Sequence, residues 1–148
     1  MLVHPQTVGP EKVEGEIEVH ITSKGDNSCT LNVDITSPRG ERVFSKRQKA
    51  RLDGKPVSVA FSVDKPTLWS LRDPALYTVT ASIGEDSITD RVAVRTGFRS
   101  IGASTAEGLT INGERTPVRG VTLYHDNALS GGTLTPEDYD ADLRIIRT

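Results

Sequence analysis

The residues best placed for chemistry are Tyr124, His125 and Asp126, which directly follow a predicted strand over residues 118–123. The Asp126 carboxylate can accept charge-assisted hydrogen bonds from a ligand, and the imidazole of His125 lies beside it in the sequence. Two plainer interpretations stay open at this point. The pair Asp126-Asn127 is also common loop-forming chemistry, and His125 fits a surface histidine.

The other carboxylates near this segment have structural explanations. Glu107 and Glu114 flank a predicted hairpin, and Glu137 falls in the first turn of a predicted helix, where the helix dipole favours an acid. The single cysteine, Cys29, cannot form an internal disulfide and shares its strand parity with Leu31, so we expect it to point into the core. The sequence therefore predicts no metal cluster and no reactive thiol.

Alternating apolar residues and regularly spaced turns indicate an all-β fold. Apolar residues of one parity recur over the following predicted strands: 16–21, 29–35, 41–45, 57–63, 76–83 and 87–95. Turns recur about every ten residues, which is typical of an immunoglobulin-like or fibronectin-like β-sandwich of roughly seven strands. Residues 1–11 contain two prolines and fit a linker or an edge segment.

The composition changes after residue 101. Residues 102–108 are rich in Gly, Ala and Ser and predict a linker, and Asn112-Gly113 predicts the tight turn of a hairpin. The predicted strand at 118–123 leads to a helix that begins at Thr135, with an N-cap, a proline at the first helical position and acids in the first turn. A strand, a loop and a helix form the first half of a parallel βαβ crossover.

The predicted helix has one apolar face and no stop signal. Tyr139, Leu143 and Ile146 recur at i, i+4 and i+7, so this face is built to be buried. No Gly, Asn or Pro follows Ile146 to end the helix. We therefore expect the chain to be a fragment, and the exposed helix face to promote self-association.

Two further residues read as structural. Trp69 lies just before a predicted strand and between two prolines, where a large ring covers the end of a sandwich core or a domain interface more readily than it stacks on a sugar. Gly97 lies where the chain leaves the last strand of the sandwich, and predicts a bulge or a close approach of the backbone.

Three segments, in this order, resemble glycoside hydrolase family 2, which comprises β-galactosidases, β-glucuronidases and β-mannosidases. They are residues 68–77 (Leu-Trp-Ser-Leu-Arg-Asp-Pro-Ala-Leu-Tyr), Asp90 with residues 97–101 (Gly-Phe-Arg-Ser-Ile), and residues 109–113 with Arg119-Gly120-Val121. The resemblance implies an immunoglobulin-like domain over residues 1–101. It further implies that residues 102–148 are a linker, a hairpin and the first strand-loop-helix unit of a truncated (β/α)8 barrel.

The resemblance also implies a function for the parent protein. The family cleaves terminal β-glycosides with retention, and the segment from Tyr124 to Asp126 with the residues after it is most similar to the β-galactosidase branch. Asp126 aligns with an acid that contacts the sugar, while Tyr124 stands where the family usually has His, a role that His125 partly replaces. The two catalytic glutamates of such an enzyme are expected beyond Thr148, so this chain holds no catalytic residue and is expected to be inactive alone, with no redox cofactor.

Alternative functions remain open. β-Glucuronides and β-mannosides are other substrates that the family takes. A non-catalytic immunoglobulin-like binding or adhesion module, or a carbohydrate-binding module, also fits a sandwich, although one Trp, three Tyr and three Phe leave few aromatics for sugar stacking. A net charge of −2 gives no footprint for nucleic acid or an anionic membrane, and the short basic run at 46–51 fits a solvated loop or a strand edge.

Overall fold

The computed structural model describes residues 1–22, 28–84, 88–124, 126 and 131–147 of the chain. The turns that follow the predicted strands 16–21 and 76–83 therefore fall largely outside the described residues. By its contacts the chain divides into two compact units, Met1–Pro117 and Val118–Thr148, and each is considered by itself.

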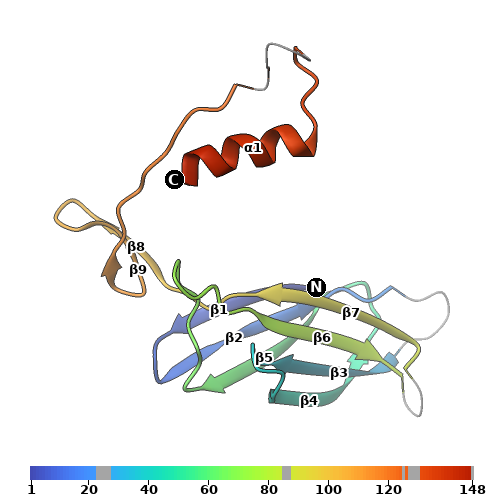
Figure 1. The fold of residues 1–148 in the computed structure, drawn as a ribbon. Helices are drawn as coiled ribbons and strands as arrows, with labels where there is room; N and C mark the ends of the chain where they lie inside the picture. Colours follow the sequence, from blue (N-terminus) through green and yellow to red (C-terminus); the bar gives the residue numbers. More distant parts are fainter. Residues whose placement is uncertain (23–27, 85–87, 125, 127–130, 148) are drawn as a thin grey trace. The chain divides into compact units, whose positions relative to one another are not determined.

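The first unit contains a β-sandwich of two antiparallel sheets, as the alternating pattern predicted (Figure 1). One sheet has the order β1-β2-β5, made of Leu2–Val8, Lys12–Val19 and Val57–Asp64. The other has the order β4-β3-β6-β7, made of Arg42–Arg51, Ser28–Thr36, Tyr77–Ile83 and Asp90–Thr96. The chain changes sheet between β2 and β3, between β4 and β5, and between β5 and β6, which gives the crossed connections of an immunoglobulin-like domain.

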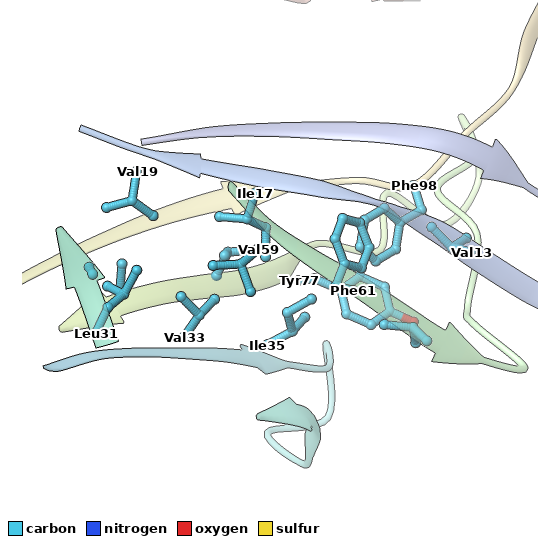
Figure 2. Close-up of a cluster of buried hydrophobic side chains, with 14 residues drawn as sticks. Val13, Ile17, Val19, Leu31, Val33, Ile35, Val59, Phe61, Tyr77 and Phe98 are labelled. Carbon is cyan, nitrogen blue, oxygen red and sulfur yellow. The ribbon is translucent and has the colours of Figure 1, made fainter. Parts of the chain in front are cut away.

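The core lies between the two sheets and is made by residues of one parity on each strand (Figure 2). On β5, for example, Val59, Phe61 and Val63 are buried while the residues between them are not. Phe98 is fully buried and stacks on Phe61, with their ring centroids 5.8 Å apart. Cys29 packs against this core as expected and is half-buried.

Two turns between strands of the sandwich contain a glycine in the left-handed region. Gly40 and Gly54 have positive φ, and the Asp53 carboxylate accepts a hydrogen bond from the Lys55 amide at 3.1 Å. The basic run at 46–51 lies in β4, an outer strand of its sheet, so it occupies a strand edge rather than a loop.

A third, smaller sheet follows the sandwich within the first unit. It has the order β10-β9-β8, made of Glu114–Arg115, Gly108–Ile111 and Ile101–Ser104. Residues 102–104, expected as linker, lie in β8 and pair with β9. Asn112 and Gly113 have φ of 53° and 80° and join β9 to β10, so the predicted Asn-Gly hairpin is confirmed as a type I′ turn.

The second unit has one described helix, α1, over Pro136–Arg147. The Asp138 carboxylate accepts hydrogen bonds from the Thr135 amide and hydroxyl, and the Asp138 amide donates to Thr135 Oγ1 at 3.3 Å. This reciprocal cap confirms the predicted helix start. Leu143 and Ile146 are exposed and Tyr139 is half-buried; self-association through this face stays a prediction.

The strand predicted over residues 118–123 is wrong for this structure, which assigns no strand to those residues. Val118, Val121 and Leu123 are exposed. A parallel strand is held by hydrogen bonds to neighbouring strands on its edges, and the described residues supply no such neighbour for this segment. The apolar pattern of 118–123 thus fits a strand whose sheet is not formed here.

Candidate functional site

The predicted binding residues lie in the second unit. Asp126 is exposed in a segment without regular structure, and Tyr124 is 77% exposed. His125 lies outside the described residues. The structure thus gives Asp126 no enclosed site, and the roles of Asp126 and His125 stay predictions.

The glutamates of the hairpin and the helix are also solvent-facing. Glu107, Glu114 and Glu137 are exposed, and the Glu107 amide donates to Ser104 Oγ at 3.0 Å inside the β8–β9 turn. Glu137 lies in the first turn of α1, as the dipole argument predicted. None of these three glutamates is buried.

The first unit contains a junction between two segments. The loop between β5 and β6, which contains Trp69, contacts the residues that follow β7. The Trp69 amide donates to the Phe98 carbonyl at 2.8 Å, and the Trp69 carbonyl accepts from Asn112 Nδ2 at 2.9 Å. Both backbone groups of Trp69 are therefore used, one toward the sandwich and one toward the hairpin. These bonds fix the hairpin to the end of the sandwich.

Asn112 is the central residue of this junction. Its side-chain Oδ1 accepts a hydrogen bond from the backbone amide of Ser100 at 3.0 Å. Its backbone amide donates to the backbone carbonyl of Ser100, also at 3.0 Å. Asn112 has a left-handed φ, a conformation that Asn tolerates better than most residues. The sequence identified Asn112 only as a turn residue, because an Asn-Gly pair carries no sign of a distant hydrogen bond.

Gly97 and Arg99 enclose the Trp69 ring. A Cβ at position 97 would lie 2.7 Å from Trp69 Cδ1, so the predicted close approach at Gly97 is present and its partner is Trp69. The Arg99 guanidinium lies 4.7 Å from the ring centroid on the ring face. Trp69 is half-buried between these groups, which agrees with a structural role.

A hollow of about 660 Å³ lies beside the junction, within the first unit. Its lining residues are Ser70, Leu71, Arg72, Ile111, Asn112, Glu114, Arg115, Thr116 and Pro117. They offer hydrogen bonds and charge pairing, and Glu114 is the only carboxylate among them. Acid–base catalysis by two facing carboxylates would need a second carboxylate beside Glu114, and the residues of this lining do not include one.

The remaining ion pairs in the described residues lie at the surface, and the carboxylates of Glu18 and Asp34 in them are half-buried. On β2, the hydrogen bond from Lys12 to Glu14, 2.7 Å long, raises the pKa of the Lys12 amine. His20 is exposed, and its Nε2 lies 2.6 Å from Glu18 Oε1. Among the described residues no group of three or more His, Cys, Asp or Glu is arranged to hold a metal ion, and no described helix is long and apolar enough to cross a membrane.

Comparison with known proteins places these features in a family. Residues 3–99 match the family model described as glycosyl hydrolases family 2. The chain is 26% identical to the β-galactosidase BoGH2A of Bacteroides ovatus over 84% of its length, and 30% identical to a β-galactosidase of Halalkalibacterium halodurans over 89%. It covers only 15% and 13% of those two proteins.

Solved structures agree with this assignment. The crystal structure of an FMN-binding β-glucuronidase from Facaelibacterium prausnitzii L2-6 is 32% identical, with a TM-score of 0.75. The match covers 99% of this chain and 22% of that protein. The relatives are thus several times longer than the present chain.

Proposed function

The chain belongs to glycosyl hydrolases family 2, and from this premise we propose that it is part of a retaining β-glycosidase whose preferred substrates are terminal β-galactosides. In that protein, Met1–Pro117 is the immunoglobulin-like scaffold with the hairpin that leads into the catalytic barrel, and the following residues begin the barrel itself.

The observation that carries this proposal is the junction of Trp69, Gly97 and Asn112. The three segments that resemble the family, residues 68–77, 97–101 and 109–113, meet at this junction through hydrogen bonds and van der Waals contact. Three segments that matched the family by chance would not be expected to contact one another in the folded chain. A junction of this kind holds the entry to a barrel in a fixed position, which catalysis by preorganised groups requires.

The preference for galactosides rests on two supports. The residues from Tyr124 onward resemble the β-galactosidase branch, and several curated relatives are named as β-galactosidases. A β-glucuronide is the principal rival, since a relative from Formosa agariphila is named a putative β-glucuronidase and is 27% identical over 88% of this chain.

The chain alone is proposed to be inactive. A retaining glycosidase uses two carboxylates about 5 to 5.5 Å apart, one as acid/base and one as nucleophile. Both are assigned to the part of the protein beyond Thr148. Purified chain, prepared in a host that lacks β-galactosidase, should release no nitrophenol from nitrophenyl β-galactoside above the buffer rate.

The complete open reading frame tests the parent's activity. Its product is expected to hydrolyse nitrophenyl β-galactoside faster than the glucuronide and the mannoside, and to release the β-anomer first, as followed by proton NMR. A preference for the glucuronide would reject the galactoside assignment. An open reading frame that ends at Thr148 would reject the enzyme altogether.

Asp126 is proposed to bind sugar hydroxyls in the complete enzyme. A lost charge-assisted hydrogen bond costs about 1.5 to 3 kcal/mol, so Asp126→Ala should lower kcat/KM by about tenfold to a hundredfold. The matched control is Asp140→Ala, which removes an exposed carboxylate on α1 that lies 4.0 Å from Arg144. Equal kcat/KM values for the two variants would remove Asp126 from the substrate site.

A further inference from the structure

The turn between β9 and β10 joins two residue types that readily form a cyclic imide. Asn112 and Gly113 are the loop residues of this hairpin, and theirs is the only Asn-Gly pair in the sequence. In such a pair the backbone nitrogen of the glycine attacks the side-chain carbonyl carbon of the asparagine. Glycine favours the attack because it has no Cβ to shield its nitrogen. This chemistry is independent of the function proposed for the parent protein.

Water has access to the reacting atoms. Gly113 is exposed, and apart from its chain neighbours a Cβ built on it would meet no atom within 4 Å. Asn112 is half-buried and lines the hollow of about 660 Å³ beside the junction. Because an imide is opened by water, the turn provides both the nucleophile of the first step and a path for the reactant of the second.

The junction nevertheless holds the reactive amide group in place. Oδ1 of Asn112 accepts a hydrogen bond from the Ser100 amide at 3.0 Å, and Nδ2 donates to the Trp69 carbonyl at 2.9 Å. Both polar atoms of the side chain are thus bonded to backbone groups outside the hairpin. Attack on Cγ makes this carbon tetrahedral and moves both atoms out of the amide plane, so neither hydrogen bond keeps its geometry. The two bonds therefore oppose the reaction.

We propose that Asn112-Gly113 is a deamidation site controlled by the junction, slow while the two side-chain hydrogen bonds are closed and faster when they open. The Gly113 nitrogen bonds to Cγ of Asn112, the Cγ–Nδ2 bond breaks, and the proton of the Gly113 amide leaves with the side-chain nitrogen as ammonia. One water then opens the imide at either carbonyl and gives aspartate or isoaspartate. In total one water is consumed and one ammonia is released, with no oxidant or reductant.

The reaction removes the group that restrains it. Nδ2 of Asn112 is the donor to the Trp69 carbonyl, and it is also the atom that leaves. The oxygen in its place is an acceptor, so two acceptors face one another where a donor was 2.9 Å from the carbonyl. In isoaspartate the backbone also gains a carbon, which the two-residue loop does not accommodate. The junction therefore does not close again in its original form, and each opening that leads to deamidation is permanent.

A second site in the same chain serves as an internal reference. Asp53-Gly54 forms the same kind of imide by loss of water, and the imide reopens to aspartate and isoaspartate. The exposed Asp53 carboxylate accepts a hydrogen bond from the Lys55 amide at 3.1 Å, within its own turn. Opening of the junction leaves this local bond unchanged. Isoaspartate at position 53 thus measures the reaction conditions, whereas isoaspartate at position 112 measures the junction.

The test follows isoaspartate at both positions in the purified full chain, kept in mildly alkaline buffer and mapped by peptide mass spectrometry. Folded chain should deamidate at Asn112 about tenfold or more slowly than chain unfolded in urea, because two hydrogen bonds must open first. Gly97→Ala, which crowds Trp69, should raise the Asn112 rate about threefold or more and leave the Asp53 rate unchanged. The control Gly9→Ala adds only an ordinary contact at 3.7 Å and should alter neither rate.

The chemistry of the site is tested in unfolded chain, where the stability of a variant has no influence. In urea, Gly113→Ala should slow deamidation of Asn112 severalfold because its Cβ shields the nitrogen, and in heavy-oxygen water the product should gain one oxygen from the solvent. The proposal is overturned if folded and unfolded chain deamidate equally fast, if Gly97→Ala changes both positions alike, or if position 112 forms no isoaspartate in urea. Thermal unfolding verifies that the sandwich of each folded variant is intact.

Discussion

Replacement of Gly97 by Ala tests the junction at its tightest contact. The added Cβ would lie 2.7 Å from Trp69 Cδ1 and 2.9 Å from both Trp69 Cβ and Cγ. Trp69 Cβ is fixed by the backbone and does not move when the side chain rotates, so no rotamer of Trp69 relieves the overlap with this atom. The Trp69 backbone is itself held by the Phe98 carbonyl and by Asn112 Nδ2, so the whole junction must shift.

Overpacking of this kind costs about 1 to 3 kcal/mol, and the fixed backbone places Gly97→Ala near the upper end, at about 3 kcal/mol. For a chain of this size that lowers Tm by about 10 °C. Trp69 is the only tryptophan in the sequence, so its fluorescence during denaturant unfolding reports directly on the junction. Gly9→Ala is the matched control, because its nearest atom would be the Lys12 carbonyl oxygen at 3.7 Å, an ordinary contact.

A double-mutant cycle isolates the clash from other effects of the extra methyl group. In a Trp69→Ala background most of the overlapping atoms are gone, so Gly97→Ala should cost at least about 1 kcal/mol less than in the wild type, measured by far-UV circular dichroism. If Gly97→Ala were as stable as Gly9→Ala, or if its cost were the same with and without the indole ring, the reasoning about this junction would be refuted.

Two more predictions concern the hairpin and the helix. Asn112→Ala should destabilise the hairpin by about 3 kcal/mol, from two lost hydrogen bonds and the cost of a left-handed alanine, while Asn112→Gly should cost about 2 because it keeps the backbone conformation. Exchange of the Ser100 amide with solvent measures both, and equal exchange in wild type and variants would contradict the role of Asn112. Thr135→Ala should cost α1 about 1 kcal/mol through loss of its cap, measured by exchange of the Asp138 amide. Thr133→Ala, outside the helix, should leave that exchange unchanged, and a matching loss there would refute the cap.

Most of the sandwich could be predicted from local patterns because most of its strands carry their own signal. The edge strand β1 carries none, and its residues were predicted only as a linker or an edge segment. Val59, Phe61 and Val63 alternate with polar residues, and one face of a half-buried strand must be apolar whatever its neighbours are. The cap of α1 was predictable for the same reason, since Thr135 and Asp138 contact one another within one helical turn. Such signals do not depend on residues far away in the sequence.

The strand predicted over residues 118–123 shows where local signals end. Its apolar residues favour a buried strand, but a strand exists only when a neighbour accepts and donates its ladder hydrogen bonds. The same limit applies to Asp126, because a carboxylate becomes a binding site only when other elements enclose it. The composition of the loop shows that Asp126 is a hydrogen-bond acceptor, but it carries no information on which elements enclose that carboxylate.

The sequence by itself predicted a sandwich of roughly seven strands, the parity of most of them, the Asn-Gly turn, the start of the helix and the family to which the chain belongs. All of these depend on residues that are close together in the chain or on short motifs. The tertiary structure decided that Trp69, Gly97 and Asn112 meet at one junction and that both polar atoms of the Asn112 side chain are bonded there. Both arrangements depend on strand order and register, which bring together residues dozens of positions apart and which no local pattern encodes.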